Sequence, residues 1–205
     1  MLSQTAQSGY TSSSRLNSLI NNRVPTPFQF IPPHPVFLVP CVASQWDGVR
    51  IAMLHPGDEA FAGDAKENNR SCVLRVDAGE GGALLTGDIE REAERYLVDR
   101  FPASLTADVL VVPHHGSLTS SSEAFIDAVA PSVALFPVGY ANRYGFPKPA
   151  VVARYGERGI QRLDSAHHGA IRFRLGAEPA VQLAETYRQT GARYWTAREP
   201  ASVAP

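Results

Sequence analysis

Short apolar runs separated by polar turns predict an α/β fold for the central part of the chain. Residues 83–85 and 108–112 have the length and composition of buried strands. Between them, residues 89–100 carry apolar side chains at the spacing of one helical face: Ile89, Ala93, Tyr96 and Leu97. A strand, a helix and a second strand in this order bring two strand ends to one edge of a sheet.

The two halves of this region have different patterns. Residues 36–39, 49–54 and 71–76 are predicted strands, and residues 77–82 have the composition of a hairpin turn. The second half alternates, with helices predicted at 120–129 and 149–158 and strands at 133–138, 160–163 and 170–175. Gly159 fits the position that ends a helix. The pattern predicts two sheets with helices outside them.

The ends of the chain are predicted to lie outside the folded domain. Residues 1–35 are rich first in serine and then in proline, which indicates a mobile or extended tail. Residues 177–205 have a mixed pattern and are expected to form a C-terminal tail, which leaves 36–176 as the domain. No apolar run approaches the roughly 18 residues of a membrane-spanning helix, so we expect a soluble chain.

Composition narrows the possible partners. The hydrophobic content of 44% is sufficient for a packed core, and the net charge of −1 gives no general basic field. Any contact with nucleic acid must therefore come from a local cluster of residues. The two cysteines, Cys41 and Cys72, are either buried thiols or, in an oxidising compartment, a disulfide, and we expect the disulfide.

Polar residues with metal-binding chemistry follow the two central strands. Asp88 comes after residues 83–85, and His114 and His115 come after residues 108–112. Taken alone, Asp88 favours the N-cap of the following helix, and a histidine pair favours a solvated strand end. Together, an aspartate and two imidazoles at neighbouring strand ends predict a site for a divalent cation.

Two later segments are candidates for substrate contact. Ser117 and the hydroxyl residues after it favour a helix cap, and the alternative is phosphate binding at the same helix N-terminus. Asn142, Arg143 and Tyr144 lie on a loop expected to face the site. Arg143 would bind a phosphate and Tyr144 would stack on a base, although a solvated loop fits this sequence equally well.

Several of these segments together resemble a known family. They are WDGV (46–49), LHP (54–56), NNRSCVL (68–74), LLTGD (84–88), ADVLVVPHHGSLTSS (107–121) and NRYGFPKP (142–149). The chain is similar over about residues 41–170 to the metallo-β-lactamase-like domain at the C-terminus of ComEC, the membrane channel of natural DNA uptake.

The resemblance implies a fold, a cofactor and a role. The fold is an αββα sandwich with a metal centre at one edge, where Asp88 bridges two ions and His114 binds one of them, with His115 as an alternative or supporting ligand. The ions, Zn or Mn, would activate a water for phosphodiester hydrolysis. The implied partners are DNA and the channel portion of the same protein, with the domain on the periplasmic or external side of the inner membrane.

The chain departs from the family at two places. The HxHxDH motif, which supplies most ligands in the superfamily, does not occur, and Phe146 stands where many relatives have histidine. We therefore expect a sandwich that is incomplete at its N-terminus, with weak metal binding and impaired hydrolysis. Whether the chain is an enzyme stays open, and the alternative is a DNA-binding or structural module that keeps the fold without metals.

Overall fold

The computed structural model describes residues 43–57, 66–176 and 179–191. The chain divides into two units, residues 1–37 and 38–205, and every described element belongs to the second. The predicted tail at 1–35, the predicted strand at 36–39 and Cys41 lie outside the described residues. Cys72 is exposed and has a free thiol, which gives no support to the expected disulfide.

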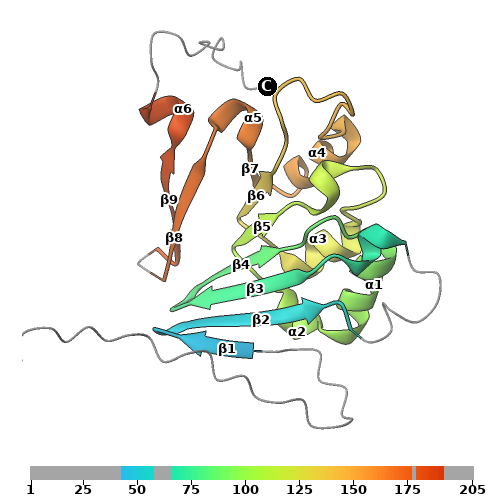
Figure 1. Cartoon of the computed structure of the whole chain (residues 1–205), viewed down its shortest axis with the longest axis vertical. Coiled ribbons are helices and arrows are strands. Elements are labelled where there is room, and N and C mark those ends of the chain that lie inside the picture. Colours follow the sequence, from blue (N-terminus) through green and yellow to red (C-terminus); the bar gives the residue numbers. More distant parts are fainter. Residues whose placement is uncertain (1–42, 58–65, 177–178, 192–205) are drawn as a thin grey trace, which may run out of the picture. The chain divides into compact units, whose positions relative to one another are not determined.

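A seven-stranded mixed sheet forms the centre of the fold, with its strands in sequence order (Figure 1). The strands are β1 (Ala43–Trp46), β2 (Val49–His55), β3 (Val73–Ala78), β4 (Gly81–Leu85), β5 (Val109–Val111), β6 (Val133–Phe136) and β7 (Gln161–Asp164). From β1 to β4 the neighbours are antiparallel, and from β4 to β7 they are parallel. Within the described residues, the prediction of successive strands in the first half and of alternating helices and strands in the second is therefore correct.

Helices fill the crossovers that parallel strands require. They are α1 (Arg91–Arg100) and α2 (Pro102–Leu105) between β4 and β5, α3 (Glu123–Val129) between β5 and β6, and α4 (Pro149–Gly156) between β6 and β7. Two 3-10 turns are η2 (Glu67–Arg70) and η3 (Pro113–Gly116), and two short helices are α5 (Ser165–His168) and α6 (Tyr187–Thr190). Helix α4 ends at Gly156 with Glu157 as its C-cap, so Gly159 lies two residues beyond the cap, in the turn after the helix, where its φ is 69°.

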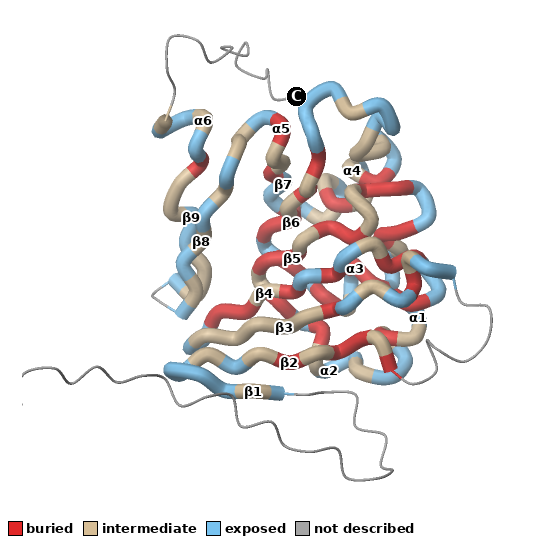
Figure 2. The backbone as a smooth tube through the Cα atoms, viewed as in Figure 1, coloured by how far each residue is buried: buried red, intermediate tan, exposed pale blue. Residues whose placement is uncertain are grey.

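The core lies where the parallel strands meet the helices. Leu84, Leu110 and Ala134 pair in register across β4, β5 and β6, and all three are fully buried. Leu97 of α1 and Phe125 of α3 belong to the same buried cluster. Figure 2 shows this concentration of buried backbone along β4 to β6, with β1 and the C-terminal strands much more exposed.

A second sheet consists of the antiparallel strands β8 (Ile171–Leu175) and β9 (Val181–Thr186). β9 was not predicted, and it continues the fold beyond the expected boundary at residue 176. The hairpin packs closely on the β3–β4 turn, where a Cβ atom at Gly81 would collide with the carbonyl oxygen of Ala180. The mixed α/β architecture agrees with the predicted fold class. No helix in the described ranges is long and apolar enough to cross a bilayer.

Candidate functional site

The polar candidates gather at the carboxyl ends of the parallel strands. Asp88 follows β4, His114 and His115 follow β5, a loop covering residues 137–148 follows β6, and Asp164 ends β7. Because parallel strands point the same way, these ends meet at one edge of the sheet, where ligands bind in open α/β folds. The predicted convergence of the two central strand ends is present in the structure.

Asp88 is not a helix cap. Helix α1 begins at Arg91, and its N-cap position is Glu90. The backbone N–H of Asp88 donates to the Ser71 hydroxyl at 3.2 Å, and its side chain is 46% exposed. The two residues between Asp88 and the helix remove the carboxylate from the first turn, so it remains available at the sheet edge.

The backbone of the histidine pair is strained. His114 and His115 have φ angles of 48° and 55°, in the left-handed region that residues other than glycine rarely adopt. The N–H of His114 donates to the Gly87 carbonyl oxygen at 3.0 Å, and the His114 carbonyl oxygen accepts from Ser117 N–H at 2.9 Å. These bonds hold the strained turn against the loop that carries Asp88. Such strain is typical of functional sites.

His115, and not His114, faces Asp88. Its Nδ1 lies 2.7 Å from the carbonyl oxygen of Pro137, and because a carbonyl only accepts, Nδ1 carries the proton. In the neutral ring Nε2 then presents a lone pair, 3.4 Å from Oδ1 of Asp88. Both atoms direct lone pairs into the same space, so a divalent cation placed there could be bound by both of them. A carbonyl that fixes the tautomer is also the usual partner of a metal-binding histidine.

His114 points into a different cluster. Its Nδ1 lies 3.6 Å from Oε1 of Glu90 and 3.3 Å from Oγ1 of Thr119, and that hydroxyl donates to Glu90 at 3.0 Å. Lys66 donates to the other carboxylate oxygen of Glu90 at 2.9 Å. The hydrogen bond from Lys66 holds the pKa of Glu90 below its usual range. Sequence reasoning missed Glu90, whose only signal is its place two residues after Asp88.

The loop after β6 presents an aromatic ring to the histidines. The Phe146 ring lies 6.3 Å from His115 in a stacked orientation, with an interplanar angle of 18°, and 5.8 Å from Tyr144 at 20°. The side chain of Asn142 accepts from Phe146 N–H at 2.9 Å and donates to its carbonyl oxygen at 2.7 Å. Arg143 lies over the Tyr144 ring at 4.8 Å from its centre.

Only part of a metal site is present among the described residues. Asp88 and His115 fit as two ligands, since ligands about 2.0–2.1 Å from a tetrahedral ion are about 3.3 Å apart and these two atoms are 3.4 Å apart. No group of three or more His, Cys, Asp or Glu side chains in the described part of the chain is arranged to hold an ion. The described residues therefore do not form a complete site.

The predicted substrate-binding residues divide into two groups. The hydroxyl of Ser117 lies 3.1 Å from that of Thr119 and its residue is buried, while the Asn142 amide is engaged by Phe146. Both support the loops. Arg143 and Tyr144 are exposed beside the site. Their roles toward a substrate stay predictions.

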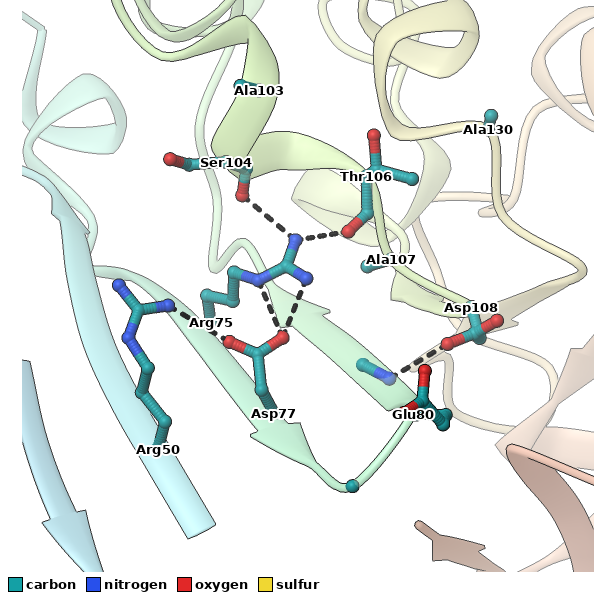
Figure 3. A pocket seen from close by; sticks show the side chains of 13 residues that line it. Arg50, Arg75, Asp77, Glu80, Ala103, Ser104, Thr106, Ala107, Asp108 and Ala130 are labelled. Carbon is teal, nitrogen blue, oxygen red and sulfur yellow. Dashed lines mark hydrogen bonds and ion pairs between the residues drawn. The ribbon is translucent and has the colours of Figure 1, made fainter. Parts of the chain in front are cut away.

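A cavity of about 530 Å³ lies at the amino ends of β4 and β5, away from the edge that carries Asp88 and the histidines. Figure 3 shows the Arg75 guanidinium between the Asp77 carboxylate and the carbonyl oxygens of Ser104 and Thr106. Asp108 accepts from the Gly82 N–H at 2.8 Å. Because these charged groups are used in structural contacts, we place no function here.

Comparison with known proteins identifies similar sequences. The pattern of the metallo-beta-lactamase superfamily matches residues 20–139. Competence protein ComA of Neisseria gonorrhoeae is 44% identical over 132 residues, which is 64% of this chain and 19% of that protein. ComE operon protein 3 of Bacillus subtilis is 38% identical over 110 residues, 54% of this chain and 14% of the relative. Recombination protein 2 of Haemophilus influenzae is 39% identical over 110 residues, 53% of this chain and 13% of the relative. The chain spans less than a fifth of the length of these relatives.

Proposed function

The chain belongs to the metallo-beta-lactamase superfamily and is similar over part of its length to competence proteins, and from this premise we propose that it serves DNA uptake in natural transformation. Its part is to contact the incoming strand at the edge formed by Asp88, His115 and the loop after β6. The single observation that supports this most is the 3.4 Å approach of His115 Nε2 to the Asp88 carboxylate, with the imidazole tautomer held by Pro137.

The superfamily is one of metal-binding proteins, and the finer assignment is part of this proposal. Asp88 and His115 would hold a divalent ion, Zn or Mn, which when bound would polarise a phosphodiester and its attacking water. The chain's own residues orient the ligands: Pro137 fixes the imidazole, and Ser71 holds the backbone of Asp88. With two ligands among the described residues, we expect weak binding and slow hydrolysis, because affinity follows ligand number.

Cationic and aromatic residues beside the pair would position the strand. Arg143 and Lys148 offer positive charge to phosphates, and Tyr144 offers an exposed ring to a base. The positive charge is local, in keeping with a chain of net charge −1. We do not assign a DNA contact to the hydroxyl of Ser117 or the amide of Asn142, because both are used within the loops.

A second candidate is a DNA-binding module that acts without metal. The observation that favours it is the lack, in the described ranges, of a third ligand near Asp88 and His115. In either case the partners would be DNA and the channel portion of a ComEC-type protein. The domain would lie on the periplasmic or external side of the inner membrane.

Incubation of the full chain with an end-labelled single-stranded oligonucleotide tests both candidates. Cleavage that requires Mn²⁺, stops with EDTA and is lost in Asp88→Asn would support the hydrolase. Binding that survives EDTA without cleavage would support the module. If the chain neither binds nor cleaves the oligonucleotide, the proposed role in DNA contact is wrong.

A further inference from the structure

We propose that the cavity beside the loop after β6 accepts one unstacked base of a single DNA strand, while the phosphates of that strand stay outside it. The cavity has a volume of about 490 Å³, within the range of pockets that hold small ligands. Its lining includes Val138, Gly139, Tyr140, Phe146, Ala166 and His167. The inference rests on the proposed function and adds where a base would be bound.

Charge separates the inside of the cavity from its surroundings. Asp164 lines it, and its carboxylate accepts from the backbone N–H of His167 at 2.7 Å and lies 2.7 Å from His167 Nδ1. None of the described residues that line the cavity is a lysine or an arginine. A phosphate would therefore meet a carboxylate and apolar walls, whereas a neutral base could bury its ring faces and keep its polar edge near Asp164 and His167.

The cations lie around the cavity, each over an aromatic ring. Lys148 is 5.2 Å from the centre of the Phe146 ring, and Arg188 is 6.0 Å from that of Tyr140. Arg143 lies over Tyr144, next along the loop. Aromatic rings with adjacent cations are the features by which proteins bind single strands, with bases stacked and phosphates neutralised. The spread of these cations over the loop and helix α6 suits a strand better than a free nucleotide.

The wall of the cavity formed by the segment around Phe146 is held in place before any ligand binds. The Asn142 side chain donates to the Phe146 carbonyl oxygen and accepts from the Phe146 N–H, which fixes the Phe146 backbone, and Lys148 N–H donates to the Gly116 carbonyl oxygen at 3.0 Å. At Gly116 a Cβ atom would approach Pro147 to 2.8 Å, so the loop and the histidine turn are in close contact. A preformed wall reduces the entropy lost on binding.

Phe146 connects the cavity to the candidate site. Its ring lines the cavity and is also stacked against His115, which faces Asp88. A strand with one base in the cavity would therefore place a neighbouring phosphate near the Asp88–His115 pair. A duplex keeps its bases stacked inside the helix and offers none to the cavity, so the pocket favours single strands.

Gly139 permits a test that fills the cavity without straining the fold. A Cβ atom at Gly139 meets no atom within 4 Å, and its φ is not in the left-handed region. Gly139→Phe would occupy the cavity, and Gly139→Ala is the matched control. The probes are a fluorescent single-stranded oligonucleotide and an abasic strand of the same length, bound by the full chain in EDTA at one salt concentration.

The wild-type chain should bind the base-bearing strand about tenfold more tightly than the abasic strand, the loss expected for one stacked base. Gly139→Phe should remove the part of that difference that comes from the base in the cavity, leaving only the part due to a base stacked on Tyr144, and Gly139→Ala should retain all of it. Equal binding of the base-bearing strand by wild type and Gly139→Phe would overturn the pocket while leaving the proposed function intact. If wild type binds neither strand, both proposals are overturned.

Tyr140→Ala provides a second variant that does not depend on tolerance of a large side chain. Tyr140 is 65% exposed, so its removal should not affect folding. It should weaken binding of the base-bearing strand and leave the abasic strand unchanged. An equal loss for both strands would show that Tyr140 contacts the sugar–phosphate backbone of the DNA and not a base, which would contradict the proposed base pocket.

Discussion

The buried carboxylate of Glu94 accepts a hydrogen bond from the backbone N–H of Ser122. Glu94 lies in the middle of α1 and is fully buried, and Ser122 is the N-cap of α3, with a donor–acceptor distance of 2.8 Å. Ser121 N–H donates to the other oxygen, and the Tyr155 hydroxyl donates to the Ser121 side chain at 3.0 Å. The segment after the histidine turn is thus held by a carboxylate from another helix, not by the serine hydroxyl cap expected from the sequence.

Glu94→Gln should change how stability depends on pH. Burial raises the pKa of Glu94 from its ordinary value of 4.5. In the wild-type chain the protonated carboxyl of Glu94 contributes stability that is fully present below pH 4.5, the ordinary pKa, and that is lost as the pH rises through the raised pKa of the folded chain. The free energy of unfolding of the glutamine variant, minus that of wild type, should therefore increase with pH, by at most about 1.4 kcal/mol per unit. Urea unfolding between about pH 4 and 7 measures the difference, and parallel curves would exclude Glu94 as the titrating group.

Divalent cation binding should distinguish the two histidines. His115 faces Asp88, whereas His114 contacts Glu90 and Thr119. Calorimetric titration of EDTA-treated chain with Zn²⁺ should give weak binding that falls at least tenfold in His115→Ala and in Asp88→Asn, since each removes one of two ligands. His114→Ala is the matched control and should bind as wild type does. The reverse order would return the ligand role to His114, as the sequence predicted.

Asn142→Asp should loosen the loop that carries Phe146. The aspartate can still accept from the Phe146 N–H, but its second oxygen replaces the amide that donates to the Phe146 carbonyl. Loss of that bond should lower the unfolding free energy by about 1 kcal/mol. Exchange of the Phe146 amide hydrogen, followed by mass spectrometry, should become faster. Unchanged exchange would show that the Asn142 side chain does not hold the loop.

Gly81→Ala should release the β8–β9 hairpin from the β3–β4 turn. The added Cβ atom would collide with the Ala180 carbonyl oxygen, and backbone cannot move aside as a flexible side chain can. We expect a lower melting temperature and faster hydrogen exchange in β8 and β9, with β4 to β6 still protected. Gly139→Ala, where the added atom meets open space, serves as the control. Equal exchange in both variants would contradict the close packing at Gly81.

The sequence by itself determined the order and type of the central elements. The short apolar runs at 83–85 and 108–112 are local signals of buried strands, and the structure has β4 and β5 at these positions. The 3.6-residue spacing of Ala93 and Leu97 likewise predicts a buried helix face, and both are buried in α1. Ile89, also expected on that face, is buried but precedes the helix, which begins at Arg91. These features depend on neighbours along the chain, so they can be read without a structure.

The tertiary structure alone decided which side chains form the candidate site. His114 and His115 are adjacent and identical, and only the left-handed turn and the Pro137 carbonyl determine that His115 faces Asp88. Strand β9 and the cap from Glu94 depend on partners distant in sequence. Local periodicity records which face of an element is buried, but it carries no information about which distant backbone group will accept or donate the next hydrogen bond.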